Sequence, residues 1–328
     1  MNTAISRNPY DRGCPHGIMF HRFHASHESD QSQGALTPDE FDRILVHVGI
    51  ENILSPLEWM SRLEKNCLGA QDLCLTFDDG LRSQLEYAMP VLNRHGLQAF
   101  WFIYSCVFDG KPLKSEIYSH VAGQVGGMPV LIEEFLSRCP SGMLLRLDSD
   151  EFRTYAKGMC TDYPFYTTID IQYRFLRGLP EYKEDYEGLM DQLIGEQGFD
   201  PVELTSQLWL TEDDLKTLTE KGHSVGLHSY DHPYDLAQLI YEEQRQQYET
   251  NYAHIVSVTQ RKPTSVAHPL NSYNGDSLAV LQQLGIQCGF RANMLPPPPT
   301  RHINPHCLEL AREDAVNVLS EMNDGCNN

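Results

Sequence analysis

Short apolar segments alternate with amphipathic segments along most of the chain. Residues 17–20 form an apolar run of strand length, and Leu73, Leu75 and Phe77 alternate with their neighbours as in a β-strand. Residues 99–104 form a near-continuous apolar run, which is typical of a strand covered on both faces. These positions predict three buried strands in the first third of the chain.

A helix is expected between the first two of these strands. Residues 37–40 read Thr-Pro-Asp-Glu, which combines a capping box with proline at the first helical position. Phe41, Ile44, Leu45 and Val48 then repeat at helical spacing. This pattern predicts an amphipathic helix with one buried face.

The second half of the chain repeats the alternation of strands and helices. Strands are expected at 224–227, 265–267 and 287–291, and helices at 211–222, 235–258 and 275–284. Such alternation favours an α/β fold with parallel strands. Because no glycine-rich phosphate loop follows any strand, we expect a barrel rather than an open sheet.

Residues 107–205 interrupt this alternation. They contain short helical pieces rich in Tyr, Asp and Glu, such as residues 182–194. We interpret them as a mostly helical insertion between two barrel strands, within a single domain that spans residues 1–328. Insertions of this kind often form lids or substrate walls, although a purely structural excursion is an equal alternative.

Charge and composition narrow the class of protein. The chain of 328 residues carries 45 acidic and 25 basic side chains, a net charge of −20. This balance disfavours nucleic acid and anionic membranes as partners, because both require clustered Lys and Arg. No apolar run approaches the roughly 18 residues of a membrane span, and the first residues show no secretory signal. Nine cysteines with no C-x-x-C pair are typical of a reduced chain, so we expect a cytoplasmic protein.

A pair of adjacent carboxylates follows the second expected strand. Asp78 and Asp79 stand in the sequence Thr-Phe-Asp-Asp-Gly, in which Gly80 allows a tight turn. Neighbouring like charges are unfavourable unless a cation lies beside them. The motif therefore indicates either a cation site or an ordinary Asp-Asp-Gly turn.

Imidazoles follow a later strand. His228 and His232 are spaced as H-x-x-x-H, which places two rings one turn apart if the segment coils, so that both can hold one metal ion. His223, just before that strand, is interpreted as structural. His21 follows the first strand, and His268 follows the strand expected at 265–267.

Four polar clusters thus follow four different strands. In an α/β barrel the carboxyl ends of the strands share one face, where active sites lie. An aspartate and two histidines on that face, with a water in the fourth position, would make an open catalytic metal site.

With these motifs the chain resembles the polysaccharide deacetylase family (carbohydrate esterase family four). The resemblance rests on TFDDG at 76–80, GHSVGLHSYDHP at 222–233, GIMFHRF at 17–23, LTPDEFDRIL at 36–45 and VAHPLNSYN at 266–274. It implies a distorted (β/α) barrel, usually of seven strands. It also implies a hydrolase of N- or O-acyl groups on sugars, most often the acetamide of an N-acetyl hexosamine.

The resemblance assigns roles to individual residues. Asp79, His228 and His232 correspond to the metal ligands, and Asp78 corresponds to the general base that takes a proton from the attacking water. The backbone N–H of Leu270 corresponds to the donor that stabilises the oxyanion beside the metal. Two imidazoles and one carboxylate suit zinc, but also cobalt, nickel or ferrous iron.

The sequence departs from the family at two places. The arginine that usually partners the base falls at Ala267, and Arg312 is the candidate replacement, with a surface arginine as the alternative. The late L-x-H motif that usually supplies the general acid is missing. His21 is the first candidate for the acid, and His268 is a candidate pocket residue. The rival candidates for the acid are His24, His302 and His306.

The substrate expected from these observations is an amino sugar carrying an N-acetyl or N-formyl group. A cytoplasmic location favours a precursor of a surface polysaccharide or of the lipopolysaccharide O-antigen. A hydrolase of a non-sugar amide and a catalytically silent carbohydrate-binding module are the alternatives. The retained base Asp78 favours an enzyme, because a binding module gains nothing from its repulsion with Asp79. The oligomeric state is left open.

Overall fold

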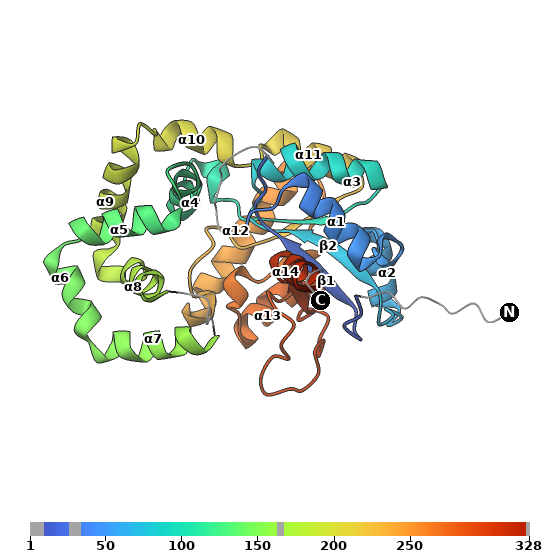
Figure 1. Cartoon of the computed structure of the whole chain (residues 1–328). Helices are drawn as coiled ribbons and strands as arrows, with labels where there is room; N and C mark the ends of the chain where they lie inside the picture. Colours follow the sequence, from blue (N-terminus) through green and yellow to red (C-terminus); the bar gives the residue numbers. More distant parts are fainter. Residues whose placement is uncertain (1–9, 26–33, 163–166, 326–328) are drawn as a thin grey trace. The chain divides into compact units, whose positions relative to one another are not determined.

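The computed structural model describes residues 10–25, 34–162 and 167–325. By its internal contacts the chain divides into two compact units. Unit 1 takes residues 1–26, 36–111 and 209–328, and unit 2 takes residues 27–35 and 112–208. All the strands formed by these described residues lie in unit 1 (Figure 1).

Unit 1 is built on seven parallel strands. They are β1 (His16–Phe20), β2 (Leu73–Phe77), β3 (Phe100–Ile103), β4 (Ser224–Leu227), β5 (Ser265–Ala267), β6 (Cys288–Phe290) and β7 (Arg312–Asp314). Their order in the sheet is β6-β5-β4-β3-β2-β1-β7. All six strands expected from the sequence are present. β7 was not predicted, because its three residues Arg-Glu-Asp carry no apolar pattern.

The segment before β7 nearly closes the sheet into a barrel. Leu310 forms a parallel bridge with Phe290 at the end of β6, and its N–H donates to Gly289 O at 2.8 Å. Two residues later the same segment pairs with β1, where Arg312 lies opposite Gly17. The predicted (β/α)7-type barrel is therefore confirmed.

Helices surround the strands and cover their outer faces (Figure 1). They are α1 (Pro38–Val48), α3 (Met89–His95), α11 (Glu212–Glu220), α12 (Tyr241–Thr259), α13 (Gly275–Gln283) and α14 (Ala315–Gly325). α2 (Pro56–Glu64) instead packs through Trp59 against Phe290 and the interior side of the strands. α1 begins at the predicted capping box, in which Thr37 accepts from Glu40 N–H and the Glu40 carboxylate accepts from Thr37 N–H. Its residues Phe41, Ile44 and Leu45 are fully buried against the barrel.

The strand residues alternate between two apolar layers. Leu75, Phe77 and Trp101 belong to the layer shared with the helices, whereas Cys74 and Phe102 belong to the barrel interior. This alternation is the period of two expected of a strand. Continued past the strand ends, it places residues 21, 78 and 228 on the interior side at one end of the barrel.

Unit 2 is mostly helical in its described part, as predicted for the insertion. Its helices are α4 (Lys114–Gln124), α5 (Met128–Arg138), α6 (Ser141–Leu144), α7 (Asp150–Asp162), α8 (Thr168–Arg177), α9 (Lys183–Glu196) and α10 (Pro201–Leu208). Phe135, Tyr173 and Tyr186 form its aromatic centre with ring centroids 5.5–6.0 Å apart. The Tyr173 and Tyr186 hydroxyls are hydrogen-bonded at 2.8 Å.

His223 has the structural role predicted for it. Its Nδ1 accepts from Ala99 N–H at 3.1 Å and from the Trp101 indole N–H at 3.3 Å. These bonds join the starts of β3 and β4 and require a neutral ring. Burial, with a smaller contribution from the charge of Lys221, lowers the pKa of His223 to about 4.

This histidine makes folding stability pH-dependent. The unfolded chain takes up a proton at His223 below about pH 6.5, whereas the folded chain resists it until about pH 4. Stability is therefore lost as the pH falls through this window. We expect His223→Gln to reduce the slope of unfolding free energy against pH by up to about 1.4 kcal/mol per pH unit. Urea unfolding of both proteins between pH 7 and 4.5 measures this, and equal slopes would contradict it.

Candidate active site

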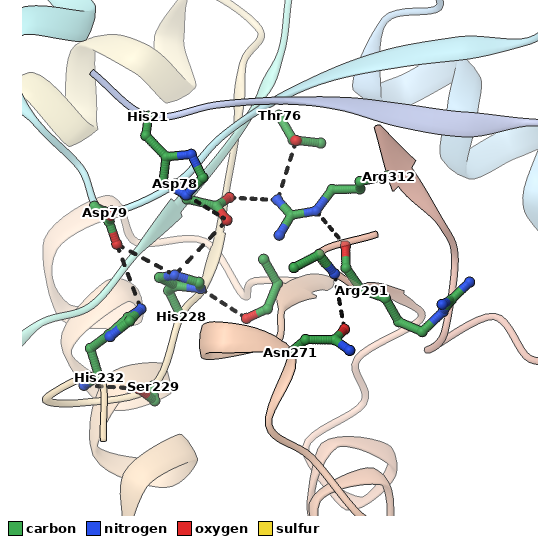
Figure 2. Close-up of polar contacts among 12 residues, drawn as sticks. His21, Thr76, Asp78, Asp79, His228, Ser229, His232, Asn271, Arg291 and Arg312 are labelled. Carbon is green, nitrogen blue, oxygen red and sulfur yellow. Dashed lines mark hydrogen bonds and ion pairs between the residues drawn. The ribbon is translucent and has the colours of Figure 1, made fainter. Parts of the chain in front are cut away.

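The turn after β2 directs two neighbouring carboxylates in different directions (Figure 2). Asp78 N–H donates to Phe20 O at 3.0 Å, which continues the pairing of β2 with β1. Asp79 then adopts a left-handed conformation with φ of 73°, followed by Gly80 with φ of 63°. A Cβ at Gly80 would also lie 2.9 Å from the Ile103 side chain. The tight turn expected of this glycine is therefore present.

Asp78 is buried and paired with Arg312. Its Oδ1 accepts from Arg312 Nη1 at 2.6 Å, and both side chains are almost fully buried. Arg312 also donates to Thr76 Oγ1 at 3.3 Å and, through Nε, to Arg291 O at 2.6 Å. The structure thus brings the candidate replacement arginine against the candidate base and excludes the alternative of a surface arginine.

The arginine charge sets the ionisation of Asp78. Burial raises the pKa of its carboxyl group, but the charges of Arg312 and His228 and the hydrogen bond from Arg312 outweigh burial. The pKa of Asp78 consequently lies below its ordinary value, so the group is ionised at neutral pH.

Asp79 lies against the two imidazoles. Its Oδ1 is 3.5 Å from His228 Nε2 and 3.8 Å from His232 Nε2. These three ligand atoms lie within 4.8 Å of one another. The pKa of Asp79 is well below its ordinary value, because the hydrogen bond from His228 and the charge of His232 outweigh burial.

The hydrogen bond of His228 Nδ1 defines which ring nitrogen carries a proton. Its Nδ1 lies 2.9 Å from Ala267 O, and a carbonyl oxygen can only accept, so Nδ1 carries a hydrogen. Nε2 is thereby the atom that gains or loses the exchangeable proton. Burial lowers the pKa of His228, but Asp78 and Asp79 outweigh it and raise the pKa above its ordinary value.

The loop that carries the two imidazoles is not helical. Ser229 and His232 have φ of 63° and 52°, and the residues from 228 to 235 form no helix. The rings still converge, with centroids 4.9 Å apart. The condition that the H-x-x-x-H segment coils is therefore not met, and the convergence depends on a turn with left-handed residues. Burial and the charge of His228 lower the pKa of His232 to about 4.

The donor set suits a divalent cation. One carboxylate oxygen and two imidazole nitrogens converge, and the backbone carbonyl on His228 Nδ1 aims the opposite nitrogen at them. Asp79, His228 and His232 are therefore the residues that could hold a metal ion. They form one such group within the described part of the chain.

His21 lies beside Asp78, at the end of β1. Its Nε2 is 3.9 Å from Asp78 Oδ2, and its side chain is 34% exposed. The rival histidines have other contacts: His24 Nδ1 lies 2.9 Å from Ala25 O, and His306 Nδ1 accepts from Leu308 N–H. His302 lies in an exposed stretch.

His268 and Leu270 follow β5. His268 is fully buried, its Nε2 lies 2.8 Å from Leu308 O, and its ring stacks on Tyr273. Leu270 has φ of 49° and a side chain that is largely exposed. His268 is thus held in the interior of the fold by packing and by its contact with Leu308, whereas Leu270 lies in the irregular turn after β5.

Sequence reasoning missed Gln84, which holds the backbone beneath the site. It is fully buried, and its Nε2 donates to His21 O at 2.7 Å and to Asp78 O at 2.6 Å. Gln84 begins a π-helical segment, Gln84–Ala88. Such bulges occur often at functional sites, but a glutamine on a helix has no sequence signal of its own.

The fold and the site define a parallel (β/α) barrel with carboxylates and imidazoles at one end of its strands. Residues 189–289 match the family model described as polysaccharide deacetylase. This range includes His228 and His232. The predicted resemblance to the polysaccharide deacetylases is thereby confirmed. A search of the curated proteins found no match.

Solved structures share the fold. A deacetylase of Streptococcus pyogenes, PplD in complex with acetate, is 17% identical, with a TM-score of 0.52 over 95% of this chain and 99% of that chain. IcaB of Ammonifex degensii is 14% identical, with a TM-score of 0.53 over 94% and 97%. A de-N-acetylase of Aggregatibacter actinomycetemcomitans is 10% identical, with a TM-score of 0.50 over 92% and 95%.

The Asp78–Arg312 pair predicts a measurable coupling. Arg312→Met would leave a buried, unpaired carboxylate and should lower the free energy of unfolding by about 3 kcal/mol. In Asp78→Asn/Arg312→Met a neutral amide replaces the carboxylate, so part of this lost unfolding free energy should be recovered. Urea unfolding of the two single variants and the double variant measures the coupling, and strictly additive losses would contradict the pairing.

Proposed function

We propose that this protein is a metal-dependent hydrolase that removes an N-acyl group from an amino sugar. The observation that carries the proposal is the convergence of Asp79, His228 and His232 next to the buried Asp78–Arg312 pair. A structural role accounts poorly for two buried carboxylates side by side, each with its own positively charged or imidazole partners. The family match over residues 189–289 supports the same class of activity.

Asp79, His228 and His232 would hold the ion. A divalent ion bound there would lower the pKa of water to about 7 and polarise an acyl carbonyl. Zinc suits this donor set best, and cobalt, nickel and iron are the alternatives.

Asp78 is the general base in this proposal. It is ionised because of Arg312, and one of its oxygens is bonded to the arginine while the other faces His21 and His228. The free oxygen can take the proton of the attacking water. Arg312 keeps the carboxylate in place, a role that residue 267 cannot fill because it is alanine.

His21 and the Leu270 N–H complete the site. His21 is partly exposed and close to Asp78, so it can reach both solvent and a leaving amine, to which it would give a proton. The Leu270 N–H would donate to the oxyanion that forms on the acyl carbon. Both assignments rest on position at the ends of β1 and β5.

The proposed substrate is a small precursor of a surface polysaccharide or O-antigen in a reducing, cytoplasmic compartment. The eight cysteines in the described part of the chain are all free thiols. Burial raises the pKa of the thiols of Cys74 and Cys288 inside the barrel, which keeps them unreactive. Within the described residues no helix is long and apolar enough to cross a membrane. Recovery of the protein from the periplasm after cell fractionation would contradict this location.

Removal of a ligand should remove the metal. We expect His228→Ala and Asp79→Ala each to lower the affinity for zinc at least 100-fold, because a three-donor site loses one donor. His223→Gln is the matched control, since that histidine lies at the other end of β4. Competition with a chromophoric chelator measures the affinities, and unchanged binding in either ligand variant would show that the assigned ligands are wrong.

Asp78→Asn separates catalysis from binding. We expect this variant to bind zinc while its turnover falls by about 100-fold or more, since a general base contributes 10²–10⁴-fold. The assay is release of acetate or formate from free, nucleotide-linked and polymeric N-acyl amino sugars with added zinc or cobalt. Circular dichroism checks that the variant is folded.

The outcomes of this panel separate the alternatives. Release that depends on both metal and Asp78 supports the proposal, and the best substrate names the sugar class. If the wild type releases neither acetate nor formate from any of the sugars, the proposal is contradicted. Metal-dependent cleavage of a non-sugar amide would then identify the alternative hydrolase, and sugar binding unchanged by Asp78→Asn would identify a binding module.

A further inference from the structure

The loop from His228 to His232 lacks regular structure, yet side chains accept several of its backbone N–H groups. His228 N–H donates to Asn251 Oδ1 at 3.0 Å, and His232 N–H donates to Ser229 Oγ at 3.1 Å. Tyr230 N–H and Asp231 N–H both donate to Gln247 Oε1, at 3.0 and 3.2 Å. The conformation of the loop is therefore specified mainly by side chains outside it.

Two of these acceptors lie on one face of α12. Gln247 and Asn251 are four residues apart, so they lie one above the other on the helix. Gln247 also donates through Nε2 to Asp231 Oδ1 at 2.8 Å, and Asn251 donates through Nδ2 to Ile103 O at 2.9 Å. Asn251 is fully buried and connects the ends of β3 and β4.

The opposite side of the loop is held by the segment after β3. Tyr230 O accepts from Ser105 N–H at 2.9 Å and from Cys106 N–H at 2.8 Å. His254, three residues after Asn251 on α12, places Nδ1 3.0 Å from Ser105 Oγ. α12 thus contacts both the loop and the segment that supports it.

We propose that Gln247 and Asn251 are positioning residues that set the conformation of the imidazole-bearing loop before any ion binds. The metal role of that loop rests on the proposed function. Ser229 and His232 have left-handed backbone angles, which are unfavourable for residues other than glycine and need compensation from surrounding bonds. Neutral amides supply that compensation without adding a charge that would compete with Asp79 for the imidazoles.

Gln247→Leu is the informative variant. Gln247 is partly exposed, so its replacement frees two loop N–H groups without opening the core. Gln246→Leu is the matched control, because it removes a neighbouring amide that is exposed on the same helix. Gln247→Glu keeps the acceptor oxygens but replaces the donor to Asp231 Oδ1 with a second carboxylate, so its loop should also exchange faster than that of the control.

Hydrogen exchange of the metal-free protein gives the first readout. We expect amides of the peptide spanning residues 228–232 to exchange at least 10-fold faster in Gln247→Leu than in Gln246→Leu. Peptides from β1 and β2 should exchange at equal rates in both variants. Equal exchange of the loop in the two variants would overturn the proposal.

Metal binding gives the second readout. We expect Gln247→Leu to bind zinc 10- to 100-fold more weakly than the control, the usual effect of losing a group that orients ligands. The visible absorption spectrum of the cobalt-loaded protein should change with it. Unaltered affinity and spectrum, with only a lower unfolding midpoint, would show a merely structural role and overturn the proposal.

Asn251→Leu tests the buried position. It should slow metal uptake and weaken affinity further than Gln247→Leu, provided that the variant folds. If it does not fold, the two Gln247 variants still test whether α12 sets the conformation of the loop. If the wild type binds no metal, the proposed function fails. The exchange experiment alone then still decides whether α12 sets the conformation of the loop.

Discussion

The buried ion pair between Asp78 and Arg312 is the interaction on which the site depends. A carboxylate inside a barrel is unfavourable unless a charge and hydrogen bonds compensate it, and Arg312 supplies both at 2.6 Å. Gly17 makes room for this side chain, because a Cβ there would lie 3.1 Å from Arg312 Cγ and 3.2 Å from Thr76 Cγ2. The pairing of β7 with β1 then fixes where the guanidinium enters.

The same pair explains how two adjacent carboxylates coexist. Asp78 continues the interior side of β2 and meets the arginine, whereas the left-handed backbone of Asp79 turns its carboxylate towards His228 and His232. Asp78 is bonded to Arg312, whereas Asp79 faces the two imidazoles, so the two carboxylates can take different roles although His228 lies near both. In the proposed enzyme, one holds the ion and the other stays free to move a proton.

Much of this arrangement could be predicted from the sequence, and the parts that could not have clear reasons. Six strands and the helix from Pro38 carry local apolar patterns or caps, and each is present. β7 was missed because three polar residues have no such pattern, and its position is determined by pairing with β1 far away in sequence. The contact between Arg312 and Asp78 could be suggested but not decided, since 234 residues separate them.

The loop geometry shows the limit of spacing arguments. H-x-x-x-H places two rings one turn apart only if the segment coils, whereas here the rings converge through left-handed residues held by amides from α12. Gln84, Gln247 and Asn251 are polar residues on helices, and nothing local distinguishes them from solvent-facing amides. Their role becomes visible only when the strand ends that they join are placed in space.

A stoichiometric metal titration tests the central claim most directly. Chelator-treated protein is titrated with zinc while deacylation of the best N-acyl amino sugar is followed. The account predicts no activity without metal, and activity that rises linearly and saturates at one zinc ion per chain. Full activity of the metal-free protein, or activity that does not follow occupancy of a single site, would contradict it.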